Sequence, residues 1–164
     1  MGSQRFGQIE LVRFGCVIAG ILLTVGLQGA QSAPTPGGGR RVIRAGPPTA
    51  GLPYSPGILV NNTLYIAGTI GEDAANKIVP GGIEAETRQA LANLGELLKA
   101  AGMSFRDVAS VTVYITSFDD FATFNKVYQQ VFSTDPPART TVQVAALIGG
   151  AKVELQAIAA RPHS

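Results

Sequence analysis

Residues after position 40 carry two repeating patterns of apolar and polar side chains, one typical of strands and one typical of helices. Residues 58–60 (ILV) and 63–68 (TLYIAG) flank the turn pair Asn61-Asn62, which predicts a β-hairpin. Residues 41–44 predict a short edge strand ahead of a Gly-Pro-Pro break. The first part of the folded region is therefore expected to contain three strands.

A second set of strands is predicted further along the chain. Residues 108–116 (VASVTVYIT) alternate apolar and polar side chains, as in a strand with one buried face. Residues 141–147 and 153–159 predict two more strands. Because only a short turn containing Gly149-Gly150 joins them, we expect these two strands to pair as a hairpin.

A first helix is predicted from about residue 83 to residue 101. It follows the break at Gly81-Gly82, and Gly102 is expected to cap its carboxyl end. Four leucines recur at spacings of three and four, which indicates one buried face. They are Leu91, Leu94, Leu97 and Leu98.

A second helix is predicted to begin at the cap Ser117. Asp119 and Asp120 in its first turn suit the positive end of a helix dipole. Asp135-Pro136-Pro137 is expected to end it. Its buried stripe is expected to be Phe121, Phe124, Tyr128 and Val131.

The predicted element order is β-β-β-α-β-α-β-β. An α/β (α+β) domain, with two helices packed on one face of a mixed β-sheet, is the economical way to bury these apolar faces. No internal repeat interrupts this order.

The amino terminus has the pattern of a secretory signal peptide. Arg5 and Arg13 precede an apolar run at residues 16–27 (CVIAGILLTVGL), and small residues follow at 29–33. The run is shorter than the roughly 20 residues of a membrane-spanning helix. We therefore expect residues 1–33 to be a signal peptide or an N-terminal anchor, residues 34–39 (PTPGGG) a spacer, and residues 40–164 the folded domain.

This leader predicts a periplasmic or secreted protein. Glu10 in the basic region and Pro34 after the best cleavage position keep two alternatives open. One is a membrane-anchored protein with an uncleaved leader, and the other is a cytoplasmic protein whose start codon is wrongly placed.

Composition excludes several classes of function. The formal net charge is only +2 and 15% of residues are charged, so a nucleic-acid or acidic-membrane surface is not expected. His163 is the single histidine, which argues against a metal site and against a Ser-His or Cys-His pair. Cys16 is the single cysteine, so no internal disulfide is possible.

The sequence contains no phosphate-binding loop, no dinucleotide-binding glycine motif, no nucleophile elbow and no Cys-x-x-Cys pair. Two charged residues stand out instead. Glu154 lies inside a predicted strand, where burial and neighbours can tune a carboxylate as a base, and Arg139 opens the preceding strand, where its guanidinium can grip a carboxylate. If the strands are hairpin partners, the two lie near one another. The alternative is a solvent-facing glutamate and a surface cation.

Several segments together resemble the RidA (YjgF/YER057c/UK114) family. Residues 136–155 (PPARTTVQVAALIGGAKVEL) are similar to the family signature, in which Pro-Ala-Arg opens a strand and a Glu follows in the next strand. Residues 53–57, 64–70 and 118–125 are similar to three further family segments in the same order. The resemblance spans roughly residues 40–161.

This resemblance implies a chorismate-mutase-like fold, assembled as a homotrimer with sites in clefts between subunits. It implies hydrolysis of reactive 2-enamine and 2-imine acids, such as 2-aminoacrylate, 2-iminopropanoate and 2-iminobutanoate, to a 2-keto acid and ammonia. No cofactor or metal is expected. The expected partners are the small imino acid and further copies of the chain, with no nucleic acid and no stable membrane partner.

The resemblance also assigns roles to residues. Arg139 is expected to bind the substrate carboxylate, and Glu154 to activate the attacking water. The expected lining and supporting residues of the cleft are Tyr54, Gly68, Asn125 and Thr141. Ala67 and Thr141 depart from the family pattern, which often has Ser and Cys there, so substrate preference is open.

Two other functions remain open at this point. A trimer that binds small carboxylates or aromatic metabolites without turnover would use the same fold, since function resides in the site. An RNA-cleaving protein is less compatible with a nearly neutral domain.

Overall fold

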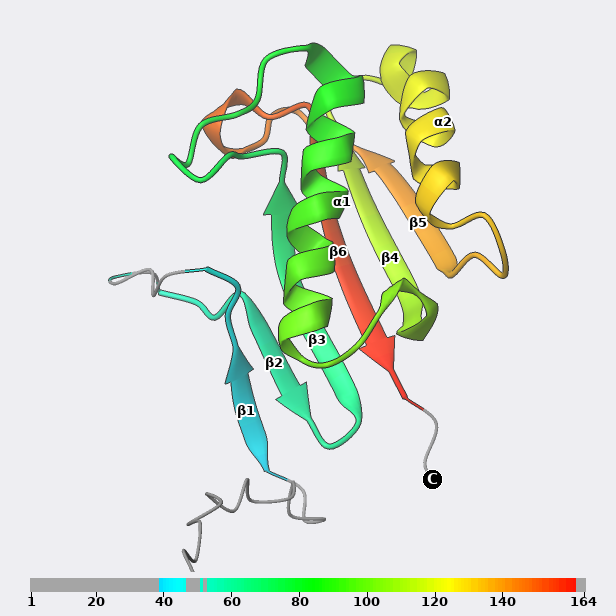
Figure 1. The fold of residues 1–164 in the computed structure, drawn as a ribbon. Coiled ribbons are helices and arrows are strands. Elements are labelled where there is room, and N and C mark those ends of the chain that lie inside the picture. The colour runs from blue at the N-terminus through cyan, green and yellow to red at the C-terminus, as the bar shows by residue number, and fades with distance from the viewer. Residues whose placement is uncertain (1–38, 47–50, 52, 162–164) are drawn as a thin grey trace, which may run out of the picture. The chain divides into compact units, whose positions relative to one another are not determined.

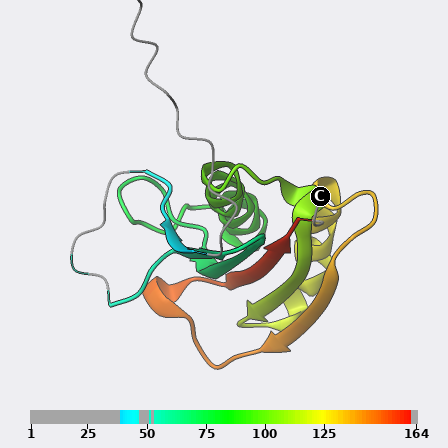
Figure 2. The same cartoon turned by 90° about the horizontal axis from the view of Figure 1, so that it is seen from below.

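The structure, a computed structural model, describes residues 39–46, 51 and 53–161. The predicted leader, nearly all of the predicted spacer and His163 lie outside these residues. Within them, six strands form one sheet in the order β1-β2-β3-β6-β4-β5, and two helices cover one of its faces (Figure 1; Figure 2). The elements are β1 (Arg40–Ile43), β2 (Gly57–Val60), β3 (Thr63–Ile70), α1 (Gly82–Ala100), β4 (Val108–Ile115), α2 (Phe121–Val131), β5 (Ala138–Gln143) and β6 (Val153–Ala160).

The first three strands agree with their prediction. β1 pairs antiparallel with β2 at one edge of the sheet, and β2 pairs antiparallel with β3 across Asn61 and Asn62. Asn61 has a φ of 53°, a left-handed conformation that asparagine tolerates better than most residues. The turn pair therefore supplies the backbone geometry that this hairpin requires.

Helix α1 also agrees with its prediction, and all four predicted leucines are buried. Its carboxyl end is closed as expected by Gly102, whose φ is 70°. The amide of Gly102 donates to the Lys99 carbonyl at 2.8 Å, and the amide of Met103 donates to the Leu98 carbonyl at 2.8 Å. These two bonds satisfy carbonyl groups that the end of a helix leaves free.

The second helix is shorter at both ends than predicted. The Ser117 hydroxyl caps a short 3-10 turn (Phe118–Asp120) by accepting from the Asp119 amide at 3.1 Å, and α2 proper begins only at Phe121. The helix ends at Val131, ahead of the proline pair. Phe124 and Tyr128 are buried as predicted, while Phe121 and Val131 are half-buried against the core.

The predicted hairpin of the last two strands is wrong. β5 pairs in parallel with β4 at the sheet edge, and β6 lies between β3 and β4, antiparallel to both. The connection from β5 to β6 passes the end of β4, where Val144 donates to the Ile115 carbonyl and Thr116 donates to the Lys152 carbonyl.

Burial explains this topology. Alternate residues of β6 are almost completely buried, which suits a central strand, whereas most of β5 is exposed, which suits an edge. The strand, helix and strand formed by β4, α2 and β5 make a crossover unit, and such a crossover joins parallel strands.

The buried core lies on the helix side of the sheet. The inward residues of β6 are Val153, Leu155, Ala157 and Ala159. The other face of the sheet is only partly covered, and Tyr65 on β3 is 50% exposed there. Within the part of the chain described, no helix has the length and apolar character to cross a membrane.

Candidate active site

One cleft collects three of the predicted site residues, Tyr54, Gly68 and Glu154. We call it the glutamate cleft; its volume is about 760 Å³. Strands β3 and β6, the segment before β2, the loop after β3 and the turn before β6 form its walls. Its lining residues are Tyr54, Ala67, Gly68, Ile70, Glu72, Asn76, Lys77, Ile78, Ile148, Gly149 and Glu154.

A β-bulge brings Gly68 against the Glu154 carboxylate. The β3–β6 register passes from Ile66 opposite Ala157 to Thr69 opposite Leu155, which leaves two β3 residues facing one β6 residue. A side-chain carbon added at Gly68 would overlap the carboxylate of Glu154. The absence of a side chain at Gly68 therefore leaves the space that the half-buried Glu154 occupies.

The loop after β3 is fixed to helix α1. The Asn93 side chain donates to the carbonyl groups of Ile70 and Glu72, at 3.1 and 2.9 Å. The Asp73 carboxylate accepts from the amides of Ala75 and Lys77 and closes the loop on itself. These bonds hold Lys77 at the margin of the cleft.

A second cleft, of about 690 Å³, collects Arg139 and Asn125, and we call it the arginine cleft. Helix α2, the segment between α2 and β5, and the start of β5 form its walls. Its lining residues are Asn125, Tyr128, Gln129, Phe132, Ser133, Pro136, Pro137 and Arg139.

Aromatic rings of α2 support the Arg139 guanidinium. Its central carbon lies 4.8 Å from the ring centre of Tyr128, 5.5 Å from that of Phe124 and 5.7 Å from that of Phe121. A cation over the faces of aromatic rings is attracted by their quadrupole, and a guanidinium stacks there without losing its in-plane donors. Arg139 can therefore lie on this platform and still bind an anion.

The Tyr128 hydroxyl is buried and has no hydrogen-bond partner within the described chain. Burial raises the pKa of Tyr128 to about 12, against a smaller opposing effect of the nearby Arg139 charge. The phenol therefore stays neutral beneath the guanidinium at all ordinary pH values.

The prediction that Arg139 and Glu154 lie close together in one chain is wrong. Arg139 pairs with Val111 of β4, whose side chain is buried under the helices, whereas Glu154 pairs with Tyr114, whose side chain points to the other face. Paired residues of adjacent strands share a face of the sheet. The two residues therefore lie on opposite faces and in separate clefts.

Thr141 lies two residues after Arg139 on the same side of β5, opposite Val113. It is half-buried and lines neither of these two clefts. Within one chain, the predicted site residues thus divide into two sets. Tyr54, Gly68 and Glu154 form one, and Asn125, Arg139 and Thr141 form the other.

Sequence reasoning missed two groups of residues around the clefts. Lys77, Ile78 and Ile148 line the glutamate cleft from loops, where no periodicity marks them. Ile148 is 76% exposed in the structure. An apolar residue in a Gly-rich turn is a sequence signal that could have marked it as a cleft residue. Tyr128 was predicted only as a core residue, because its position under Arg139 depends on the parallel pairing of β5.

The sequence profile of the family described as Endoribonuclease L-PSP matches residues 45–161. The chain belongs to the RidA/YjgF/L-PSP family. The match covers the sheet from shortly after β1 to the end of β6, so it includes both clefts.

Named relatives share most of their length with this chain. It is 48% identical over 122 residues to the 2-iminobutanoate/2-iminopropanoate deaminase of Bos taurus, covering 73% of this chain and 89% of that protein. The human protein of the same name is 47% identical with the same coverage. Reactive Intermediate Deaminase A, chloroplastic, of Arabidopsis thaliana is 40% identical over 113 residues, covering 68% of this chain and 60% of that protein.

Solved structures agree with the fold. RidA from an Antarctic Psychrobacter has a TM-score of 0.69 at 36% identity, covering 74% of this chain and 99% of that chain. TdcF of E. coli with bound serine has a TM-score of 0.69 at 34% identity with the same coverage. The six-stranded mixed sheet with two helices is therefore a YjgF-like fold.

Proposed function

We propose that this chain hydrolyses 2-imino and 2-enamino acids, such as 2-iminobutanoate and 2-iminopropanoate, to the 2-keto acid and ammonia. The observation that carries the proposal is the similarity to deaminases of these imines over 89% of their length. Arg139 and Glu154 in their clefts provide the two functional groups that this chemistry needs.

The proposed chemistry needs no cofactor. The Arg139 guanidinium binds the substrate carboxylate through two hydrogen bonds. The protonated imine carbon is electrophilic, and Glu154 takes a proton from water as the water oxygen attacks that carbon. Glu154 then returns the proton to nitrogen, the C–N bond breaks and ammonia leaves, while the hydroxyl group on the same carbon gives its proton to Glu154 and becomes the carbonyl.

We propose that the site is completed between subunits of a homotrimer. In one chain Arg139 and Glu154 lie on opposite faces of the sheet, so a single copy does not bring them to one substrate. The sheet face away from the helices carries exposed Tyr65 and Val142, which suits burial against another copy. The arginine cleft of one copy would then meet the glutamate cleft of the next, with Thr141, Asn125, Tyr54 and Gly68 around the substrate.

A coupled assay with the full chain tests this proposal. An amino-acid oxidase generates 2-iminobutanoate in the presence of semicarbazide, and hydrolysis lowers the semicarbazone signal. We expect Arg139→Ala to lower kcat/KM by about 100-fold through loss of the charged hydrogen bonds. We expect Glu154→Gln to lower kcat by ~100-fold or more through loss of the base. Arg106→Ala, at an exposed arginine outside both clefts, is the control and should match the wild type.

A folded wild-type protein that does not suppress the semicarbazone signal would contradict deaminase activity on these imines. Binding of 2-oxobutanoate to that protein, measured by calorimetry and lost in Arg139→Ala, would instead support the non-catalytic binding trimer. Absence of both turnover and binding would reject the site as a whole.

We further propose that residues 1–33 direct export to the periplasm or the exterior. The basic start, the apolar run and the small residues after it support this proposal. Expression of the full chain in a bacterial host, followed by fractionation and N-terminal sequencing, tests it. An exported product beginning near residue 34 is expected. Full-length protein in the membrane fraction would indicate an anchor, and full-length protein in the cytoplasm would contradict export.

A further inference from the structure

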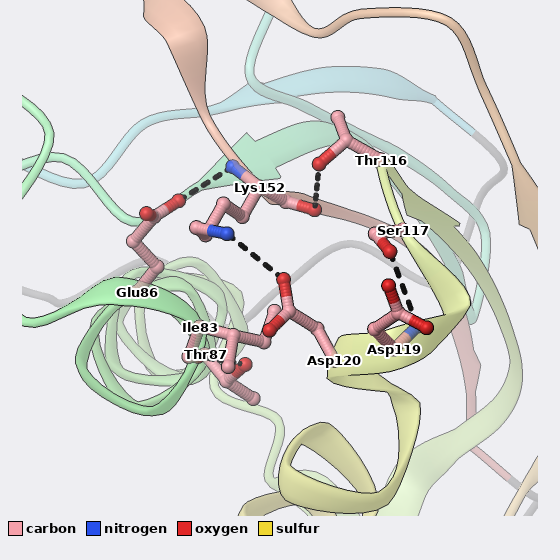
Figure 3. A network of polar contacts seen from close by, with 8 residues as sticks. All are labelled: Ile83, Glu86, Thr87, Thr116, Ser117, Asp119, Asp120 and Lys152. Atoms are coloured by element: carbon pink, nitrogen blue, oxygen red, sulfur yellow. Dashed lines mark hydrogen bonds and ion pairs between the residues drawn. The ribbon is translucent and has the colours of Figure 1, made fainter.

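Glu86 of helix α1 is a buried carboxylate outside both clefts. Only 4% of the residue is exposed. Removing a charged group from water costs several kcal/mol unless hydrogen bonds compensate. One such bond is present, because the Lys152 backbone amide donates to the Glu86 carboxylate at 2.6 Å (Figure 3). The bond joins α1 to the residue that precedes β6.

Lys152 is held from two further directions. Its ammonium group donates to the Asp120 carboxylate at 2.9 Å, at the start of α2. Its carbonyl accepts from the Thr116 amide at 3.1 Å, at the end of β4. Figure 3 shows Glu86, Asp120 and Thr116 surrounding Lys152. The Asp120 pair holds only the end of the Lys152 side chain, whereas the Glu86 bond holds the backbone amide of Lys152, two residues before Glu154.

The backbone of Glu86 also supports the neighbouring β3 wall of the glutamate cleft. A side-chain carbon added at Gly71 would lie 2.6 Å from the Glu86 α-carbon, so the backbone after β3 packs directly on Glu86. The preceding residue, Ile70, is paired with Glu154 across the sheet. The backbone of Glu86 therefore supports the β3 wall, while its carboxylate holds the β6 wall.

We propose that Glu86 is a positioning residue that holds the Glu154 carboxylate in its position beside Gly68. This inference rests on the proposed deaminase function, in which Glu154 activates water. Glu86 lines neither the glutamate cleft nor the arginine cleft. Its loss should therefore affect the chemical step and spare carboxylate binding.

Three variants separate positioning from general stability. Glu86→Met keeps a similar volume but removes the hydrogen-bond acceptor. We expect its kcat for 2-iminobutanoate to fall ~10-fold or more, since misplacement of a reacting group by 1 Å costs up to ~100-fold in rate. Its KM should stay within about two-fold of the wild-type value. Glu86→Gln keeps an acceptor oxygen and should restore at least about half of the wild-type kcat. Asp120→Asn is the matched control, because it weakens the Lys152 ion pair and leaves the Glu86 bond in place.

Amide hydrogen exchange tests the same inference without activity. The Lys152 and Glu154 amides should exchange at least about ten-fold faster in Glu86→Met than in the wild type, and at nearly wild-type rates in Glu86→Gln and Asp120→Asn. Should Glu86→Met fail to fold, Glu86→Asp retains the charge with a shorter reach and should show the same direction in kcat and exchange.

The outcomes distinguish the two proposals. An inactive wild type whose Lys152 amide is protected by Glu86 would reject the deaminase and, with it, this role of Glu86 in catalysis. An active wild type with unchanged kcat in folded Glu86→Met would overturn the positioning role alone. Equal losses in Glu86→Met and Asp120→Asn would also overturn it, because they would indicate a general effect of the network.

Discussion

At the scale of single residues, the glutamate cleft depends both on the Glu154 carboxylate and on the absence of a side chain at Gly68. The bulge in β3 turns the Gly68 α-carbon toward the Glu154 carboxylate, and no other residue type leaves room for it. The overlap involves the end of a flexible side chain, which can swing away. A change at Gly68 should therefore harm function more than stability.

We expect Gly68→Ala to lower kcat by about 10-fold or more, because the added methyl group displaces the Glu154 carboxylate. The free energy of unfolding should change by less than about 1 kcal/mol, since Gly68 lies in an exposed part of β3 and has an ordinary φ. The deaminase assay and urea unfolding together check this. A large loss of stability with unchanged kcat per folded protein would contradict it.

Tyr128 gives a prediction about alkaline pH. Its pKa is raised to about 12 in the folded protein, against 10.0 for an unperturbed tyrosine, chiefly by burial. The unfolded chain therefore loses this proton first as the pH rises, so stability is complete below pH 10 and declines between pH 10 and 12. Tyr128→Phe has no such proton and should lose stability less steeply there.

Urea unfolding at pH 8 and at pH 11 measures this effect. At pH 8 the Phe variant should be at least as stable as the wild type, because it removes a buried hydroxyl without a partner. Tyr54→Phe, at an exposed tyrosine, should show the wild-type slope. Parallel pH dependence of the wild type and Tyr128→Phe would contradict the burial of this phenol.

At the scale of elements, helix α1, which the leucine pattern predicts, holds the segments that form the glutamate cleft. Its leucine face packs on the sheet, Asn93 holds the loop after β3, and Glu86 holds the start of β6. The length of the helix is in turn limited by Gly102, where the chain adopts a left-handed conformation. A substitution at the end of this helix should therefore change the stability of the fold and leave both clefts intact.

Gly102→Ala should lower the free energy of unfolding by about 1 kcal/mol, since a β-carbon is disfavoured at a φ of 70°. Gly102→Asn should lose less, because asparagine enters this conformation more readily. Thermal unfolding measures both, and kcat should be unchanged. Equal stability of Gly102→Ala and the wild type would show that the end of α1 is not strained by a side chain.

At the scale of the whole molecule, the location of Arg139 and Glu154 on opposite faces of the sheet, together with the proposed shared site, predicts complementation between inactive chains. If each site takes Arg139 from one copy and Glu154 from the next, a mixture of Arg139→Ala and Glu154→Gln chains regains intact sites. Random exchange at equal amounts should restore about one quarter of wild-type activity, because half of the chains supply each group.

Unfolding and refolding the two variants together, with each variant refolded alone as the control, checks this complementation. Sedimentation measures whether the active species is a trimer. A mixed trimer without recovered activity would place both groups in one subunit and contradict the shared site.

The sequence by itself determined the elements and the candidate chemistry. Periods of two and of three to four residues marked most of the strands and α1, because side-chain direction follows from local backbone geometry. The strand predicted over residues 141–147 instead lies at Ala138–Gln143. Asn61 and Gly102 marked a turn and a helix end for the same local reason. The motif around Arg139 and Glu154 identified the residues on which the proposed chemistry depends.

Only the tertiary structure decided how these residues are arranged. A glycine-rich connection does not tell whether two strands pair or are separated by a third, so the placement of β6 between β3 and β4 came from burial over the whole sheet. That placement put Arg139 and Glu154 on opposite faces, and the bulge at Gly68 and the reach of Glu86 to Lys152 likewise join residues far apart in the chain. Such contacts depend on the folded sheet, and no local pattern encodes them.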